Sequence, residues 1–251
     1  MLKKLYVIVF AFILVSSPIT LAKTPLMIII DDFGNNQKGT NEMLSLDMPL
    51  NIAVMPFLDS STKEAELAYE NGHEVLVHLP LEPKSGKASW LGPKPVTTNL
   101  SNDEIRAIVL EAIESVPHAK GMNNHTGSKA TEDERVMRVV LEVCKEKGLY
   151  FIDSRTSHQS VVGKIAQEIN LPYLENQLFF DHEYSREYMN RQAQKLLTRL
   201  NERPFMIAIG HVGIAGDKMH QTLVEYSERF KENASIMTVS QYLEQSFHLI
   251  D

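Results

Sequence analysis

Leu26-Met27-Ile28-Ile29-Ile30-Asp31-Asp32-Phe33-Gly34 joins an apolar run to two adjacent carboxylates and a glycine. A run of this kind, rich in β-branched residues, predicts a buried strand. Burying carboxylates is costly unless a positive charge lies beside them, and a divalent metal ion is the simplest such partner. Because successive strand residues point to opposite sides, Asp31 and Asp32 can have different roles, one accepting a proton and the other holding an ion. A plain turn is the alternative, since Asp and Gly both favour turns.

The amino-terminal segment, the net charge and the cysteine count narrow the class of protein. Residues 1–22 combine basic residues, an apolar stretch and small residues before Lys23, which is the pattern of a secretory signal peptide. The apolar stretch is short for a membrane anchor, so we expect cleavage near Ala22, no stable membrane insertion afterwards, and an exported, periplasmic protein in residues 23–251. The net charge of −7 gives no electrostatic basis for binding nucleic acid. The single cysteine, Cys144, excludes an internal disulfide.

Strand-like and helix-like patterns alternate along residues 23–251. Short apolar runs predict strands at 26–30, 51–55, 74–78, 149–152, 178–180, 205–209 and 235–238, with a weaker one at 119–122. Capped amphipathic segments predict helices at 62–71, 101–116, 185–200 and 218–231, and one from a Thr131–Glu134 capping box to Gly148. About seven strand–helix repeats predict one α/β domain with a parallel sheet, either doubly wound or closed into a (β/α) barrel.

One segment interrupts this alternation. Residues 82–99 are rich in Pro and Gly and contain the only tryptophan, Trp90. Such a segment is either a binding loop or a packed surface loop.

Asp and His residues recur where the predicted strands end. They are Asp31 and Asp32, His78, His125 after Asn123 and Asn124, Asp153, Asp181, and His211. Functional groups of parallel α/β folds collect at the carboxyl ends of strands, so in a barrel these side chains would meet at one mouth. One carboxylate and two imidazoles commonly bind Zn²⁺ or a similar divalent ion in catalytic sites. A second carboxylate can then act as general base and a further histidine as general acid.

Each of these residues also has a purely structural interpretation. His78 could be a half-buried histidine bonded to backbone, and the Gly/Asn-rich surroundings of His125 are typical of a turn. Asp153 and Asp181 could cap the helices that follow, and for Asp181 we favour capping. We expect the remaining histidines to lie at the surface, namely His73, His118, His158, His220 and His248.

Five segments together carry a family resemblance. In chain order they are Ile30-Asp31-Asp32-Phe33-Gly34, His78-Leu79-Pro80-Leu81-Glu82-Pro83, Gly121-Met122-Asn123-Asn124-His125-Thr126-Gly127-Ser128, Phe151-Ile152-Asp153-Ser154-Arg155-Thr156 and Ile209-Gly210-His211-Val212-Gly213. With these segments the chain resembles the divergent, exported bacterial branch of the polysaccharide deacetylase superfamily. The resemblance covers nearly all of residues 23–251. It implies a (β/α)7-type barrel of the glycoside hydrolase/deacetylase kind and metal-dependent hydrolysis of N-acetyl or O-acetyl groups on a glycan.

By position, the resemblance implies that Asp31 is the general base, Asp32 and His78 are metal ligands, and His211 is the general acid. Typical members place both histidine ligands in one His-Ser/Thr-x-x-His motif. This chain has His78-Leu79-Pro80-Leu81 instead, and Glu82 follows directly after Leu81. His125 is therefore our candidate for the third ligand, with Glu82 as the substitute.

The Arg-x-Pro segment that supports the base in typical members is also absent. Candidates for supporting or substrate-binding roles are Asn123, Asn124, Asp153 and Arg155.

These features predict an exported, metal-dependent deacetylase that acts on an acetylated cell-envelope or other polysaccharide. The ligand types favour Zn²⁺ among divalent ions. The two departures from the family pattern favour an alternative, a catalytically weak or inactive periplasmic glycan-binding or envelope protein on the same scaffold. Hydrolysis of another amide or of a phosphate ester would use the same chemistry, although the motifs contain no obvious Lys/Arg clamp for phosphate.

Overall fold

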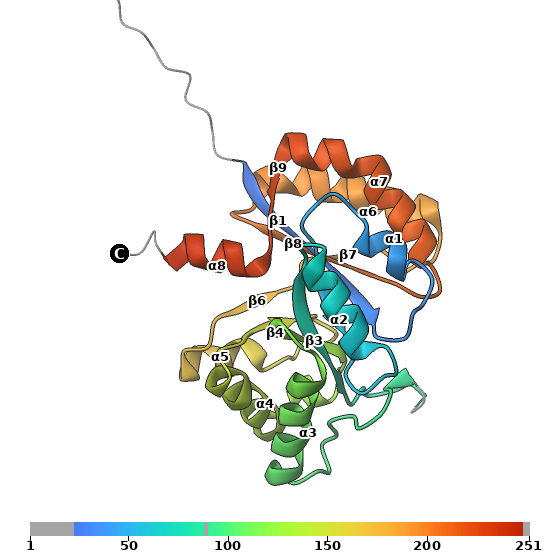
Figure 1. Ribbon diagram of the computed structural model, residues 1–251. Coiled ribbons are helices and arrows are strands. Elements are labelled where there is room, and N and C mark those ends of the chain that lie inside the picture. The colour runs from blue at the N-terminus through green and yellow to red at the C-terminus, as the bar shows by residue number, and fades with distance from the viewer. Residues whose placement is uncertain (1–22, 88–89, 248–251) are drawn as a thin grey trace, which may run out of the picture.

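A parallel sheet curled into an open barrel, with helices packed around it, forms the body of the protein (Figure 1). The computed structural model describes residues 23–87 and 90–247, so the predicted signal peptide and His248 lie outside the described residues. The strands are β1 (Thr24–Phe33), β2 (Asn51–Val54), β3 (Glu74–Leu81), β4 (Ala119–Thr126), β5 (Tyr150–Asp153), β6 (Tyr173–Glu175), β7 (Leu178–Phe179), β8 (Met206–His211) and β9 (Ala234–Ile236). The helices are α1 (Thr40–Leu44), α2 (Ser61–Glu70), α3 (Asn102–Ser115), α4 (Glu134–Glu146), α5 (Val162–Ile169), α6 (Arg186–Arg199), α7 (Gly216–Asn233) and α8 (Val239–Phe247).

The strand order confirms the predicted α/β barrel and shows where it is open. The sheet runs β6-β5-β4-β3-β2-β1-β8-β7, and β9 pairs with β1. The strands of this sheet pair in parallel, as strand–helix–strand crossovers require. The short strands β6 and β7 are the two edges, and no ladder joins them within the described part of the chain. The barrel is therefore open at a seam between β6 and β7.

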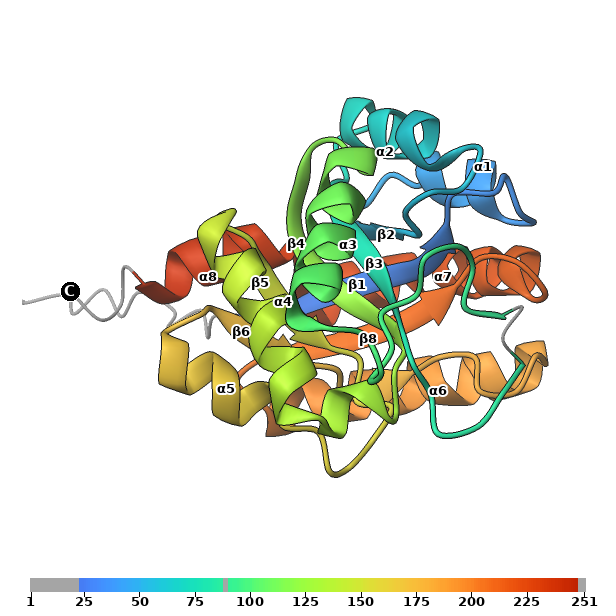
Figure 2. The same cartoon turned by 90° about the horizontal axis from the view of Figure 1, so that it is seen from below.

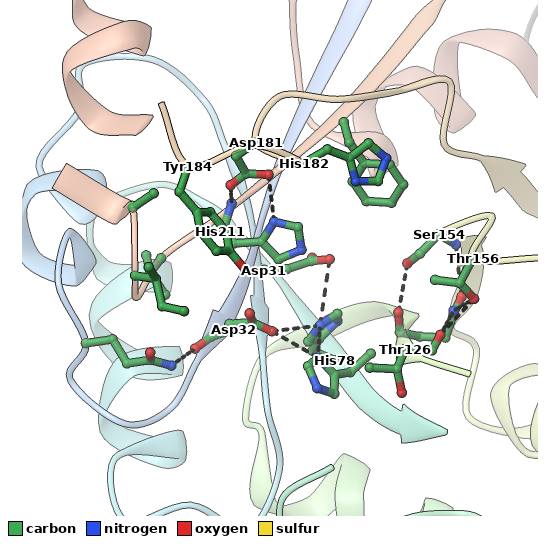
Figure 3. Close-up of a pocket in the computed structure, with 17 residues that line it drawn as sticks. Asp31, Asp32, His78, Thr126, Ser154, Thr156, Asp181, His182, Tyr184 and His211 are labelled. Atoms are coloured by element: carbon green, nitrogen blue, oxygen red, sulfur yellow. Dashed lines mark hydrogen bonds and ion pairs between the residues drawn. The ribbon is translucent and has the colours of Figure 1, made fainter. Parts of the chain in front are cut away.

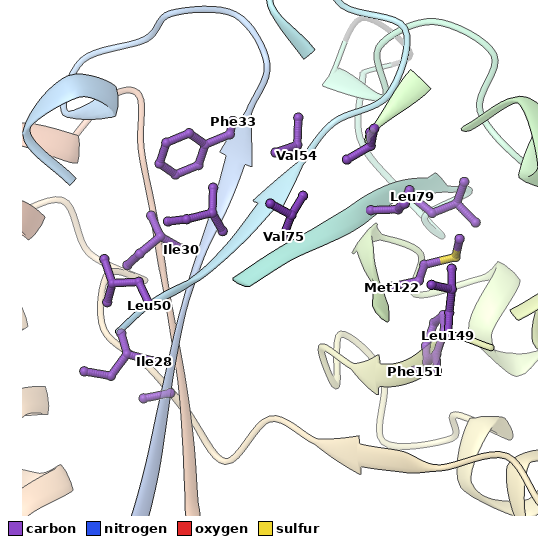
Figure 4. Packing of buried hydrophobic residues seen from close by; sticks show 14 of the residues in the cluster. Ile28, Ile30, Phe33, Leu50, Val54, Val75, Leu79, Met122, Leu149 and Phe151 are labelled. Carbon is purple, nitrogen blue, oxygen red and sulfur yellow. The ribbon is translucent and has the colours of Figure 1, made fainter. Parts of the chain in front are cut away.

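Alternation along the strands divides the core into an outer and an inner layer. Leu26, Ile28 and Ile30 pack against the helices in the outer layer, part of which is drawn in Figure 4. Met27 and Ile29 belong to the inner layer. Its buried members are Met27, Ile29, Ala53, Leu76, Tyr150, Ile152, Ile207, Ile209, Met237 and Val239.

On several strands the residues that point into the barrel change from apolar to polar toward the carboxyl end. Along β1 the inward residue Ile29 is followed by Asp31, along β3 Leu76 is followed by His78, and along β8 Ile209 is followed by His211. On β4, Met122 belongs to the outer layer, so Asn123 and His125 share the inward phase. The strand period alone thus directs these five polar side chains toward the same mouth.

Two strands are longer than their apolar runs predict. Strand β3 continues three residues beyond His78, and β4 continues to Thr126. Consequently Asn123, Asn124 and His125 lie on a strand, whereas the sequence suggested a loop. Pairing of β4 with β3 explains the difference, because the ladder His78–Asn123 to Leu81–Thr126 holds an otherwise polar segment extended.

The helix predictions are confirmed in the main, with local corrections. The Ser101–Glu104 capping box opens α3 as predicted, and Ser185 caps α6. The Thr131 capping box is wrong, because Asp133 caps α4 and Thr131 donates to the Gly127 carbonyl. Helices α1, α5 and α8 were not predicted. Among the described helices, none is long and apolar enough to cross a membrane.

One histidine expected at the surface is buried. His73 is 5% exposed, and its ring contacts the Leu44 carbonyl and the Leu50 amide. Burial lowers the pKa of His73, which favours the neutral ring in this structural role.

Candidate metal and catalytic site

A cavity of about 420 Å³ opens at the carboxyl ends of the strands (Figure 3). Figure 2 gives a second view of the strands that converge on it. Its lining includes Asp31, Asp32, His78, His125 and His211, which come from β1, β3, β4 and β8. Strand register sets their neighbours, because Asp31 pairs with His211 and His78 pairs with Asn123.

A bulge in β1 brings both carboxylates to this mouth. The register of β1 against β2 shifts between Ile30 and Phe33, and Asp32 has a positive φ of 70°. In a regular strand Asp32 would point away from Asp31, but the bulge re-aims its side chain. A left-handed backbone at a residue other than glycine costs about 1–2 kcal/mol. The two carboxylates thus share one side of the sheet, which the strand period did not predict.

Buried polar contacts hold the loop that follows this pair. The Glu64 carboxylate on α2 accepts the amide of Gly34 at 2.6 Å and the amide of Asn36 at 2.5 Å. The Gln37 side chain donates to the Asp32 carbonyl at 3.0 Å. Gly34 has a φ of 120°, and a Cβ there would lie 2.9 Å from the Met55 carbonyl. Only glycine fits this position without a shift.

Three potential metal ligands meet in the cavity. Asp32 Oδ1 lies 3.2 Å from His78 Nε2 and 3.0 Å from His125 Nδ1. The two ring nitrogens lie 3.1 Å apart. Ligands in a tetrahedral zinc site lie about 3.3 Å from one another, as bond lengths of about 2.0–2.2 Å require. The three atoms therefore have the mutual spacing of ligands around one small cation.

Hydrogen bonds assign the nitrogens that face this point. His78 Nδ1 bonds the side-chain oxygen of Asn123 at 2.7 Å, and His125 Nε2 bonds the Trp90 carbonyl at 2.9 Å. An amide oxygen can only accept, so these two nitrogens carry protons and leave His78 Nε2 and His125 Nδ1 as the free lone pairs of the neutral rings. Metal-binding histidines are oriented in this way by a hydrogen bond at the other nitrogen.

An unsatisfied carboxylate oxygen completes the case for a cation. Asp32 Oδ1 is buried and has no aligned hydrogen-bond donor among the described residues, although both ring nitrogens are close. A buried oxygen without a donor is costly, and a divalent ion would satisfy it together with the two lone pairs. The donor set of one carboxylate and two imidazoles therefore fits a metal ion.

Asn123 connects the ligand cluster to the second carboxylate. Its side-chain NH2 donates to Asp31 Oδ1 at 2.8 Å while its oxygen accepts from His78. Asn123 is fully buried, and Asp31 is 1% exposed. Asp31 Oδ2 lies 3.7 Å from His78 Nε2, so Asp31 is next to the ligand cluster without belonging to it.

His211 faces the site from β8 and is paired with Asp181. Its Nδ1 donates to Asp181 Oδ1 at 2.9 Å, and its backbone amide donates to Asp181 Oδ2 at 2.8 Å. The His211 side chain remains 33% exposed, whereas that of Asp181 is 3% exposed. Burial opposes the charged ring, but the charge and hydrogen bond of Asp181, with help from Asp31 and Asp32, raise the pKa of His211 to about 10.

The pKa values of the two adjacent carboxylates move in opposite directions in this site. Burial raises the pKa of Asp31 above its usual range, although His78 and His211 oppose this. Burial acts on Asp32 in the same direction, but the imidazoles of His125 and His78 hold its pKa well below the usual range. Asp32 is thus a permanent anion and Asp31 the carboxylate with greater affinity for a proton, an arrangement typical of a ligand beside a base.

Four other predicted residues lie outside this cluster. The Glu82 carboxylate accepts the amide and hydroxyl of Thr98 and the ammonium of Lys129, so the structure groups His125, and not Glu82, with Asp32 and His78. Asn124 ties β4 to the loop after β5 through the Ser154 amide.

Asp153 and Arg155 also lie away from the cluster. Asp153 accepts the Arg155 amide at 2.7 Å and does not line the cavity, and the Arg155 guanidinium is directed to Glu175 at 3.6 Å. The contact to Asp31 that a supporting residue needs comes from Asn123.

Sequence reasoning missed the partners that position the site. Asp181 was expected to cap a helix, but Ser185 caps α6 and Asp181 binds His211. The position of Asp181 directly after the apolar run 178–180 was the feature of the sequence that indicated a site residue. Glu64 and the Trp90 carbonyl were not predicted, because nothing in the local pattern links them to Gly34 or His125.

Comparison with known proteins places the chain in a family. The family model of divergent polysaccharide deacetylases matches residues 28–243. The chain belongs to this family. It is 32% identical to the uncharacterized protein YibQ of Escherichia coli over 214 residues, which cover 85% of this chain and 66% of that relative. It is also 31% identical to an uncharacterized protein of Haemophilus influenzae over 204 residues, covering 81% of this chain and 72% of the relative.

Solved structures share the fold of this chain. An uncharacterized protein from Agrobacterium tumefaciens superposes with a TM-score of 0.81 at 20% identity, covering 89% of this chain and 90% of that one. A peptidoglycan N-acetylglucosamine deacetylase superposes with a TM-score of 0.56 at 12% identity, covering 87% of each chain. At these identities the likeness concerns the fold alone.

Proposed function

We propose that the protein is an exported, metal-dependent hydrolase that removes N-acetyl or O-acetyl groups from a cell-envelope or other polysaccharide. The observation that carries this proposal is the arrangement of Asp31 and His211 beside the three-ligand cluster of Asp32, His78 and His125. Family membership supports a glycan as the substrate. The chain spans 66% of the length of its Escherichia coli relative, and the activity proposed is that of the barrel.

Asp32, His78 and His125 would hold the cation, for which the ligand types favour Zn²⁺. A cation held there would supply a Lewis acid that polarises the acetyl carbonyl and lowers the pKa of water. Asp31 is the residue placed to accept the proton of the attacking water, since its pKa is raised and Asn123 holds one of its oxygens. The other oxygen of Asp31 is directed to the ligand cluster.

His211 is the residue placed to protonate the departing amine or alkoxide. Its Nδ1 is bonded to Asp181, which leaves Nε2 as the nitrogen that can donate a proton into the cavity. The pKa of about 10 keeps the ring protonated at neutral pH, so it is charged before the reaction begins. The Asp181 carboxylate fixes the ring orientation, because it accepts hydrogen bonds from both Nδ1 and the backbone amide of His211.

Exposed aromatic and apolar side chains support a large, polymeric substrate. Tyr184 and Ile214 line the cavity and are 56% and 75% exposed. Trp90, whose carbonyl bonds His125, is 60% exposed. Exposed apolar groups gathered around one cavity mark a binding surface, and flat aromatic rings can pack against the apolar faces of sugar rings.

Acetate release tests the proposal directly. The purified protein, loaded with Zn²⁺, Co²⁺ or Mn²⁺, is assayed on acetylated chitooligosaccharides and peptidoglycan fragments. We expect metal-dependent release of acetate by the wild type, and its loss in Asp31→Asn with metal content unchanged. Acetate release that persists after full removal of metal would contradict the proposed chemistry.

The alternative is a glycan-binding or envelope protein without turnover. It is motivated by the ligand pattern, in which the second histidine ligand comes from β4 and not from the motif that begins at His78. Binding of acetylated glycans without acetate release, with metal at full occupancy, would favour this alternative. Export can be tested separately, by finding the mature chain in the periplasmic fraction and sequencing its amino terminus.

A further inference from the structure

A second cavity of about 600 Å³ lies beside the active-site cavity. Thr156, Phe179 and His182 line both cavities, so the two are adjacent. In Figure 3, Thr156 and His182 lie on the opposite side of the pocket from Asp32. Gln177 and Leu178, at the seam between β6 and β7, also line the second cavity. The opening of the barrel therefore creates space next to the catalytic groups.

One face of α6 forms a wall of this second cavity. Tyr188, Gln192, Lys195 and Arg199 line it, and their spacing of four, three and four residues places them on one stripe of the helix. The stripe is polar and positively charged along its C-terminal half. The stripe of α6 that packs in the core is Met189, Ala193 and Leu196, and the polar stripe lies beside it and faces the second cavity.

Two of the three Lys and Arg side chains that line the second cavity lack a carboxylate partner. Lys195 and Arg199 form no ion pair among the described residues, and Arg199 has only a 3.5 Å contact with the Gln177 carbonyl. The third, Arg155, lies 3.6 Å from Glu175 and 4.0 Å from Asp153. No Asp or Glu is among the described residues that line the cavity.

This local positive charge is opposite in sign to the net charge of the chain, which is −7. Cations gathered in a concave site without counterions attract anionic ligands. Guanidinium groups in particular match the two oxygens of a carboxylate or phosphate.

We infer that the second cavity binds an anionic substituent, a carboxylate or a phosphate ester, on a sugar next to the acetylated sugar in the active site. This inference rests on the proposed function and narrows its substrate to acidic glycans. Lys195 and Arg199 contact the anion from α6, with Arg155 facing them. Tyr188 and Gln192 offer a ring face and hydrogen-bonding groups to the same sugar.

Matched oligosaccharides test the inference. We would measure kcat/KM for three substrates that contain N-acetylglucosamine: a neutral chitooligosaccharide, one alternating with glucuronic acid, and one carrying a phosphate ester. The wild type is expected to prefer an acidic substrate, and the better of the two acidic substrates identifies the anion. Lys195→Gln/Arg199→Gln should lower kcat/KM on that substrate by at least about tenfold, through KM, because it removes charge-assisted contacts. Its rate on the neutral substrate should change less than about twofold, since no catalytic group is altered.

Arg191→Gln is the matched control. Arg191 lies on the same helix, packs on the Tyr188 ring and does not line the second cavity, so its loss removes one positive charge of α6 from outside the cavity. This variant should keep the wild-type preference. High salt should reduce the preference of the wild type for acidic substrates and leave the double variant unaffected.

Two results separate this inference from the proposed function. If every substrate is inert, calorimetric binding of the same oligosaccharides still tests the inference, and a Lys195/Arg199-dependent preference for acidic ones would support it while the proposed activity fails. Equal turnover of neutral and acidic substrates, unchanged in the double variant, would overturn the inference and leave the deacetylase proposal standing. Competition by inorganic phosphate without any effect of substrate charge would also overturn it.

Discussion

Replacing Asn123 by leucine tests the central link of the site. Asn123 holds His78 in the tautomer that presents Nε2 and also donates to Asp31, at 2.7 and 2.8 Å. Leucine has a similar shape but can do neither, so Asn123→Leu leaves a ring N–H and a carboxylate oxygen buried without partners. The variant therefore perturbs the ligand and the base together, without touching the three ligand atoms.

The expected size of the effect follows from the two contacts. A buried polar group left without its partner costs roughly 1–3 kcal/mol, so the free energy of unfolding should fall by roughly 2–6 kcal/mol. Losing a hydrogen bond that orients a metal-binding histidine lowers metal affinity by about 10–100-fold. Urea unfolding of the metal-free protein measures the first quantity, and competition with a chromogenic chelator measures the second.

Asn51→Leu is the matched control for Asn123→Leu. Asn51 is also a fully buried asparagine with two hydrogen bonds, to the Ile28 carbonyl and from the Val239 amide, but it lies outside the cavity. This control should lose stability and keep its metal affinity. Wild-type metal affinity in folded Asn123→Leu would refute the assignment of Asn123 as the residue that orients His78.

Three further predictions concern the ligands and the protons of the site. His125→Ala should lose metal and Glu82→Gln should retain it, and full metal occupancy in His125→Ala, measured by elemental analysis, would remove His125 from the ligand set. Asp181→Asn removes the charge that raises the pKa of His211 against the effect of burial. Since His211 acts in its protonated form, below its pKa, the alkaline limit of kcat/KM should move to lower pH by about one to three pH units. An unchanged pH profile of kcat/KM would contradict this role. Burial lowers the pKa of His78, but its two neighbouring carboxylates raise it above the ordinary value. Protons therefore compete with metal, and the metal affinity should fall as the pH decreases from about 8 to about 6. Constant metal affinity over this range, measured by equilibrium dialysis, would count against His78 as a ligand.

The general architecture could be predicted because its signals are local. The apolar run before Asp31 and the similar runs before Asp153 and His211 each mark a strand whose end carries a polar residue. The alternation of strands and capped helices then predicts a parallel sheet, in which such ends meet. The shortest, least apolar strands were the least predictable. Strand β4 contains Asn123, Asn124 and His125 and is extended because β3 pairs with it.

The partners within the site depended on contacts distant in sequence. Asp181 and His211 lie 30 residues apart, and Asp31 and Asn123 lie 92 residues apart. No local pattern states that one will reach the other. The capping role expected for Asp181 was therefore a reasonable reading of its neighbours and still wrong, since β7 pairs with β8 and brings the carboxylate to the imidazole.

The sequence by itself determined that Asp31, His78 and His211 would meet at one mouth, since strand period and position at strand ends are properties of short segments. Tertiary structure alone decided that His125 joins them and Glu82 does not, because the choice depends on the register of β4 beside β3 and on the contacts of Glu82 with Thr98 and Lys129. It also decided that the bulge at Asp32 turns both carboxylates to one side. A register and a bulge are set by pairing between strands, which the order of residues along one strand does not contain.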